Sequence, residues 1–146
     1  MKLKDKPRQM KGTFTLAVID RAGDTIATYT KRNLIVATGY AAVADAIGGV
    51  AGANIAQLAV GTNDANPVET DTAIQNAETF PFVSIEYPEP TSIQFNFSID
   101  YDDANGMDIN EFGLMTQDGR LFSRITREYI SKTDAIMLVG SWTINI

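Results

Sequence analysis

The sequence predicts a mainly β fold, an antiparallel β-sandwich or flattened barrel with one short helical insertion. Three observations support this fold class. Apolar and polar residues alternate with a period of two in several segments, turn-forming residues recur at short spacing, and strands do not alternate with helices. At 146 residues the chain can bury a core without disulfides or a structural metal. We therefore expect one domain of seven or eight strands.

The first two strands are expected to form a hairpin. In residues 13–20, TFTLAVID, the side chains of Phe14, Leu16 and Val18 share one face. The segment RAGD supplies a turn, and the second strand follows at 25–33.

One short helix is expected in the segment TGYAAVADAIGG. Thr38 is a suitable N-cap, and the pair of glycines that closes the segment is typical of a helix end. Tyr40, Val43 and Ile47 fall on one stripe of this helix. Because a helix of about ten residues is marginal alone, it must pack on the sheet.

The remaining strands surround one long loop. NIAQLAVG predicts a buried strand that ends at Gly61, and residues 62–79 form the longest irregular stretch, a length typical of functional or interface loops. FPFVSIE predicts a further strand, and SIQFNFSID alternates without a break. The terminal GSWTINI repeats the pattern with three inward residues: Trp142, Ile144 and Ile146.

The composition excludes most catalytic chemistry. Without cysteine the chain has no disulfide, thiol nucleophile or thiolate metal site, and without histidine it lacks the most frequent general base and metal ligand. An enzyme would have to use carboxylates, Lys or Tyr. We therefore expect that the protein is not an enzyme and binds no cofactor.

Charge is distributed unevenly along the chain. The net charge is −6, of which residues 1–11 contribute +4, leaving −10 for the rest. An acidic body argues against nucleic acid as a partner, because phosphate contacts need Lys and Arg. No apolar run approaches the ~20 residues of a membrane span, so we expect no membrane insertion, and no signal peptide is expected. We expect a basic, flexible arm at 1–12 and a β domain at 13–146. The candidate interface residues of the arm are Lys2, Lys4, Lys6, Arg8 and Lys11.

The stretch DANGMDINE, at 103–111, has the composition of a calcium loop. Aligning Gly106 with the glycine of an EF-hand places Tyr101 and Phe112 at the first and last ligand positions, so an EF-hand is excluded. Two interpretations remain, and we favour a polar β-turn at Asn105-Gly106. The other is a looser calcium site built from Asp102, Asp103 and Asp108.

Asp118-Gly119 predicts a β-hairpin with a two-residue type I′ turn. The resulting register divides the neighbouring residues between two faces. The expected core face holds Phe112, Leu114, Leu121 and Ile125. The opposite face holds Glu111, Gly113, Met115, Phe122 and Arg124.

This opposite face predicts an ion pair between Glu111 and Arg124. The two residues lie diagonally across the hairpin, and Gly113 leaves room for the guanidinium opposite it. We expect a bidentate contact if the pair is partly buried, and a weak one if Arg124 faces solvent. A carboxylate enzyme such as a glycosidase could use Asp108 and Glu111, but these acids lie around one turn rather than across a cleft.

Short signatures follow one another in a fixed order between residues 33 and 146. They are NLIVATG (33–39), LAVGT (58–62), DTAIQ (71–75), EFGLM (111–115), DG (118–119), LFSRI (121–125), ISK (130–132) and a terminal Trp strand. Each alone is a strand-edge pattern. The ordered set resembles the small β-rich modules of bacteriophage tail-fibre and baseplate proteins.

The resemblance implies a structural role in the virion: attachment of fibres to the tail or baseplate, or contact with the host surface. It implies synthesis in the host cytoplasm, assembly as a homo-oligomer, with a trimer expected, and binding to other phage tail proteins. Similar proteins lack catalytic residues. Many carry repetitive shaft sequence after this module, whereas this sequence ends at Ile146, which favours an adaptor or a short fibre subunit.

A carbohydrate-binding module is the alternative function, with a host surface glycan as its ligand. Such a module needs exposed aromatic rings that stack on sugars. The candidate residues are Tyr87, Tyr101 and Tyr129, although tyrosines near turns more often pack at strand ends.

Overall fold

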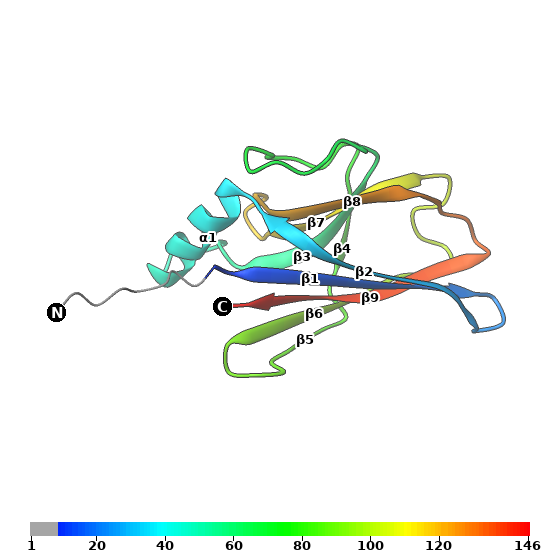
Figure 1. Ribbon diagram of the computed structural model, residues 1–146, viewed down its shortest axis with the longest axis horizontal. Coiled ribbons are helices and arrows are strands. Elements are labelled where there is room, and N and C mark those ends of the chain that lie inside the picture. The colour runs from blue at the N-terminus through cyan, green and yellow to red at the C-terminus, as the bar shows by residue number, and fades with distance from the viewer. Residues whose placement is uncertain (1–8) are drawn as a thin grey trace.

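Nine antiparallel strands and one short helix make up residues 9–146, the part of the chain that this computed structural model describes (Figure 1). The strands join in the order β4-β3-β7-β8-β2-β1-β9-β6-β5, and the sheet curls on itself as a half-barrel. The predicted mainly β, antiparallel fold with one helical insertion is therefore confirmed. The elements are β1 (Lys11–Asp20), β2 (Thr25–Ile35), α1 (Ala37–Ile47), β3 (Ile55–Gly61), β4 (Glu78–Pro81), β5 (Ser84–Glu86), β6 (Ser92–Ile99), β7 (Asp108–Thr116), β8 (Leu121–Ser131) and β9 (Ile136–Asn145).

The core lies inside the curl and is centred on Phe14 of β1. The ring of Phe14 lies 5.7, 4.8 and 5.1 Å from the rings of Phe97, Phe112 and Trp142, measured between ring centroids. These contacts join β1 to β6, β7 and β9. As the alternation predicts, the apolar face of β1 is buried, and burial of this kind is the main stabilising contribution to such a fold.

The two outermost strands of the sheet are consecutive in the chain. The run FPFVSIE does not form a single strand, because β4 pairs with β3 while β5 pairs with β6 at the opposite edge. Phe82, between the two strands, packs on Phe95 of β6 with 4.9 Å between ring centroids. This connection brings the β4 and β5 edges of the curled sheet close to each other. Because the run FPFVSIE is divided between two strands, the described residues contain more strands than the expected seven or eight.

Several boundaries differ from the predicted ones. β1 begins at Lys11, two residues before the expected start of the domain. The N-cap of α1 is Val36 rather than Thr38, whose hydroxyl instead donates a hydrogen bond to the carbonyl of Leu121. Ile146 lies beyond the paired part of β9 and is 55% exposed, so the prediction that it points inward is wrong.

β2 connects the two halves of the sheet. It pairs with β1 along most of its length but with β8 only at Leu34 and Ile35. Toward the turn between β1 and β2, at the end of the molecule far from α1, the strands β2 and β8 diverge (Figure 1). At the other end α1 packs on β8, because Gly39 has no side chain: a Cβ there would lie 2.2 Å from the Phe122 carbonyl oxygen.

Candidate functional site

The predicted ion pair between Glu111 and Arg124 is present in the interior. Arg124 Nε donates to Glu111 Oε2 at 2.6 Å, and both side chains are almost fully buried. Gly113 lies opposite Arg124 in the β7–β8 ladder, as the sequence predicts. The expectation of a bidentate contact is wrong, because the other guanidinium nitrogens donate elsewhere.

Those nitrogens hold the loop between β3 and β4. Arg124 Nη1 donates to Asp71 Oδ2 at 2.9 Å, and Nη2 donates to the carbonyl oxygens of Asn63 and Ala65 at 3.1 and 2.9 Å. The second oxygen of Glu111 accepts the backbone N–H groups of Gln75 and Asn63 at 2.6 and 3.2 Å. The pair therefore fixes the long predicted loop, and we call this set of contacts the Arg124 centre.

Sequence reasoning missed Asp71 as a partner of Arg124. The residue lies in a loop far along the chain, and a cross-strand argument reaches only the residues of one hairpin. The signal that could have found it is the signature DTAIQ, which contains both Asp71 and Gln75.

The hairpin turn at Asp118-Gly119 has a different geometry from the predicted type I′ turn. Gly119 has a positive φ of 88° whereas Asp118 does not, and the N–H of Thr116 bonds to the Arg120 carbonyl at 2.9 Å. The loop therefore has three residues, a type I turn closed by a glycine in the left-handed region.

A β-bulge follows this turn and changes which residues share a face. Leu114 pairs with Ser123, but Met115 pairs with Leu121, so Phe122 is an extra residue in β8. Phe122 consequently belongs to the main core and Leu121 to a cluster beneath the β3–β4 loop. The predicted placement of these two side chains is wrong.

Arg120 ties the turn to the helix. Its guanidinium donates to Asp118 and, at 2.7 Å, to Asp45 of α1. The side-chain hydrogen bond from Arg120, followed by that from Thr116, holds the pKa of Asp118 below its ordinary value. Asp118 and Asp45 in turn raise the pKa of Arg120.

The calcium-like loop contains a cation supplied by the chain itself. Lys132 is fully buried, and its Nζ donates to the Asn105 side-chain oxygen and the Thr133 carbonyl, both at 2.9 Å, and to the Tyr101 carbonyl at 3.3 Å. Burial lowers the pKa of Lys132, and the nearby carboxylates of Asp103 and Asp102 partly oppose this shift.

The acidic residues proposed for a metal site or for catalysis are not grouped together in residues 9–146. In that range no group of three or more His, Cys, Asp or Glu side chains is arranged to hold a metal ion, so the looser calcium site finds no support. Glu111 is engaged by Arg124 and by two backbone N–H groups, whereas Asp108 is exposed at the start of β7. These two acids do not face each other across a cleft in the hairpin, where Asp108 pairs with Ser131 and Glu111 with Thr126.

Four of the five candidate interface cations lie outside the described residues: Lys2, Lys4, Lys6 and Arg8. Lys11 is exposed at the first position of β1. Together with Arg32, Tyr40 and Glu69 it lines a polar hollow where β1, β2 and α1 meet.

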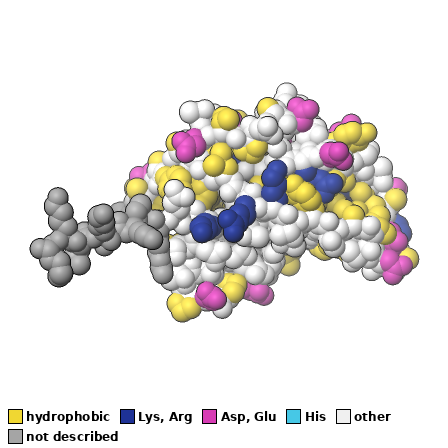
Figure 2. All heavy atoms as spheres, in the orientation of Figure 1, with side chains coloured by type: hydrophobic (Ala, Val, Ile, Leu, Met, Phe, Trp, Pro, Cys, Tyr) yellow, Lys and Arg dark blue, Asp and Glu magenta, His cyan; other side chains and the backbone are white. Residues whose placement is uncertain are grey.

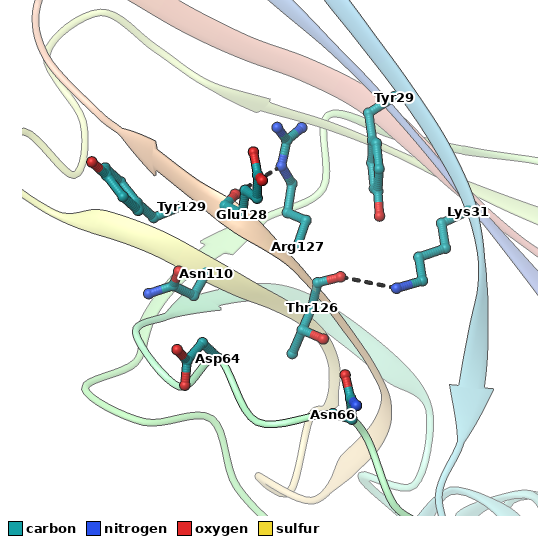
Figure 3. Close-up of a pocket in the computed structure, with 9 residues that line it drawn as sticks. All are labelled: Tyr29, Lys31, Asp64, Asn66, Asn110, Thr126, Arg127, Glu128 and Tyr129. Atoms are coloured by element: carbon teal, nitrogen blue, oxygen red, sulfur yellow. Dashed lines mark hydrogen bonds between the residues drawn. The ribbon is translucent and has the colours of Figure 1, made fainter.

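A larger, polar groove occupies the opening between β2 and β8 (Figure 3). Its volume is about 1060 Å³. Two contacts bridge the diverging strands: Lys31 Nζ donates to the Thr126 carbonyl at 3.1 Å, and the Arg127 guanidinium lies 4.6 Å from the centre of the Tyr29 ring. Figure 2 shows Lys and Arg side chains across the middle of this face. The groove is lined by Tyr29, Lys31, Asp64, Asn66, Asn110, Thr126, Arg127, Glu128 and Tyr129.

The three tyrosines named as sugar-binding candidates lie in different surroundings. Tyr129 is 63% exposed in the polar groove, and Tyr87 is 72% exposed beside an apolar hollow between α1 and the β5–β6 edge. Tyr101 is a packing residue, because its hydroxyl donates to the Asp20 carbonyl and the Arg21 guanidinium covers its ring. The structure therefore brings no two of them together.

Comparison with known proteins gives no relative. No family model, no curated protein and no solved structure matches the chain. Within residues 9–146, no helix combines the length and the apolar character needed to cross a membrane.

Proposed function

We propose that this chain is a non-enzymatic structural component of a tailed-bacteriophage virion, located in the tail fibre or baseplate. In this proposal it is made in the host cytoplasm and assembles with copies of itself and with other tail proteins. The observation that supports the proposal is that the ordered signatures, which resemble those of phage tail modules, meet at the Arg124 centre.

Five of the signatures contribute to this centre. LFSRI supplies Arg124, EFGLM supplies Glu111, and DTAIQ supplies Asp71. NLIVATG supplies Leu34, the β2 residue that pairs with Arg124. LAVGT supplies Gly61, where a Cβ would lie 2.5 Å from Glu111 Oε1. Motifs that hold one another in the interior are typical of a scaffold, whereas catalytic motifs converge on a cleft.

The experiment that tests the role is a protein inventory of virus particles. Tailed particles would be induced from a strain whose genome encodes this chain, purified by density gradient, and analysed by mass spectrometry. We expect peptides of the chain at a stoichiometry comparable to that of other tail proteins. Particles that lack the chain would contradict the proposal.

A carbohydrate-binding module is the second candidate, and the polar groove is the observation that favours it. Tyr129 offers an exposed ring, and Asn66, Asn110 and Asp64 offer the amide and carboxylate groups that hydrogen-bond to sugar hydroxyls. A glycan array with the purified protein tests this role. Binding that is lost in Tyr129→Ala but retained in Tyr87→Ala would place the sugar in this groove, and an array without binding would remove this candidate.

A further inference from the structure

β2 has a free edge along most of its length. Of its eleven residues only Leu34 and Ile35 pair with β8, and within the described chain no strand pairs with that edge from Thr25 to Asn33. The side chains between these positions are also exposed on both faces of the strand, apart from the half-buried Tyr29 and Asn33. The backbone N–H and C=O groups on this side of β2 therefore have no strand partner in the described chain, and they face the groove that the Lys31–Thr126 and Arg127–Tyr29 contacts cross.

The first six residues of this edge lack the charges and proline that usually prevent pairing with another chain, whereas Lys31 and Arg32 lie at its end. Edge strands are usually protected by charged residues, proline or a bulge. TIATYT, at 25–30, contains no charge and no proline, and consists mainly of residues that favour strands. Ile26 forms a bulge, and the residues that follow it, Ala27–Asn33, pair with β1 in a regular antiparallel register. The natural complement of such an edge is another extended backbone.

The turn of the hairpin that carries this edge is anchored to two other connections, one between β8 and β9 and one between β6 and β7. Arg21 Nε donates to the Asp134 carbonyl at 2.6 Å, and its guanidinium lies 4.5 Å from the centre of the Tyr101 ring. Tyr101 in turn donates to the Asp20 carbonyl. A strand that is already fixed in its extended form loses little conformational entropy when it pairs, which favours association.

We propose that β2 pairs antiparallel with β2 of a second copy of this chain along the free edge between Thr25 and Asn33. The contact is isologous: the same residues of both copies form it about a twofold axis near the middle of β2.

The charges of the strand favour a second copy in this orientation. Lys31 and Arg32 lie at one end of the exposed edge and Asp24 lies just before the other, with no acid between them. An antiparallel copy brings each Asp24 toward the partner's cations, whereas a parallel copy would place like charges side by side. Ile26, which is 57% exposed, would be covered near the rings of Tyr29 and Tyr129.

This contact would be one interaction surface of the assembly proposed above, and it rests on that proposal only in requiring copies of the chain to associate. A twofold contact predicts a dimer or a larger assembly with an even number of copies, such as a hexamer of two trimers. An isolated trimer does not contain it.

Cysteine trapping tests the contact directly, because the chain contains no cysteine. Thr28→Cys and Thr30→Cys place one thiol each on the regular part of the edge. Directly opposed residues of an antiparallel pair lie ~4.5–5.5 Å apart, within the span of a disulfide. We expect covalent dimers on mild oxidation for at least one of the two. Thr79→Cys, an exposed threonine on the edge strand β4, is the matched control and should remain monomeric on a non-reducing gel.

A second variant tests the same surface without oxidation. Ile26→Lys adds a charge at the proposed contact, and Ile47→Lys adds the same charge at an exposed site on α1. Light scattering should show that Ile26→Lys raises the dissociation constant of the self-association at least tenfold. Ile47→Lys should leave that constant unchanged. A monomer at all concentrations, an odd-numbered assembly, or equal behaviour of the β2 variants and their controls would overturn the inference. Virus particles that contain the chain would support the tail role regardless of this outcome.

Discussion

Arg124 and Lys132 are buried cations that each organise a loop by donating to oxygen atoms. Arg124 bonds to Glu111 and Asp71 and to two carbonyl oxygens of the β3–β4 loop. Lys132 bonds to two neutral oxygens of the 101–107 turn, from Tyr101 and Asn105, and to the carbonyl of Thr133. Burying a charge is costly unless its hydrogen bonds are satisfied, and here most of the oxygens that satisfy them come from the loops, with Glu111 of β7 as the exception. Loss of either cation should therefore loosen the corresponding loop.

Arg124→Met should lower the free energy of unfolding by about 3–5 kcal/mol, because it leaves the buried Glu111 without its countercharge. Chemical denaturation at neutral pH measures this loss. Arg32→Met, on the exposed edge of β2, is the control and should change stability by less than about 0.5 kcal/mol. The double variant Glu111→Gln/Arg124→Met should be more stable than Arg124→Met alone, since the neutral amide retains an acceptor for Gln75 N–H. A double variant as unstable as the single one would contradict the role of the buried charge.

Lys132→Met should lower the free energy of unfolding by about 1–3 kcal/mol, because it leaves buried oxygen acceptors without a donor. The melting temperatures of the unaltered chain and of Lys132→Met would also be measured with and without millimolar calcium. Calcium should not raise the melting temperature of the unaltered chain, since the amine of Lys132 occupies the centre of the loop. A calcium-dependent rise in the unaltered chain would show that the loop binds this ion.

The lowered pKa of Lys132 has a defined effect on the dependence of stability on pH. Below the ordinary value of 10.5 the unfolded chain binds the proton more tightly than the folded chain. Stability should therefore rise with pH between the folded-state pKa and 10.5. Lys132→Met should lack this rise, and denaturation curves of both proteins across the alkaline range measure the difference.

At the scale of elements, two irregularities of the β7–β8 hairpin compensate each other. The turn has three residues instead of the predicted two, which shifts the register by one, and the extra residue Phe122 in β8 restores it. Beyond the bulge, Gly113 therefore faces Arg124 as predicted, and the Glu111–Arg124 pair forms. The sequence could not reveal the bulge, because β8 is buried on both faces from Leu121 to Thr126 and alternation carries no signal there.

Strands with one buried and one solvent-exposed face were predicted more reliably than the short edge strands. β1 and β6 alternate clearly and occur where the sequence places them. β4 and β5 are short and mostly exposed, so the division of FPFVSIE between opposite edges left no pattern in the sequence. The bonds from Arg124 to the β3–β4 loop depend on contacts between residues more than fifty positions apart, which local patterns do not encode.

The turn of this hairpin should respond to acid through Asp118. Hydrogen bonds from Arg120 and Thr116 lower the folded-state pKa of Asp118 below its ordinary value of 3.8. The stability that Asp118 contributes is therefore present above pH 3.8 and is lost as pH falls through the folded-state value. Asp118→Asn should have a lower free energy of unfolding than the unaltered chain at pH 7, and this difference should disappear below pH 3.8. Urea denaturation of both proteins across this range measures the difference. A difference that persists at the lowest pH would contradict the assignment.

At the scale of the whole molecule, the curled sheet has one closed side and one open side. Residues 82 and 83 connect the two outer strands, and Phe82 packs on Phe95, so the β4 and β5 edges are held near each other. On the other side β2 and β8 diverge and leave the polar groove. The closed side maintains the curl of the sheet, and the open side carries the polar groove and the unpaired edge of β2.

Phe82→Ala should weaken the closed side without unfolding the protein. Phe82 is half-buried, so we expect a loss smaller than the ~3–5 kcal/mol typical of a fully buried phenylalanine. Hydrogen exchange should become faster in β4 and β5 together, because the same contact holds both edges, while β1 and β9 at the centre of their half of the sheet remain protected. Val83→Ala, at a site that is 71% exposed, is the control and should leave exchange unchanged. Faster exchange in only one of the two edge strands would show that β4 and β5 open independently, and that the Phe82 contact does not join the two edges of the half-barrel.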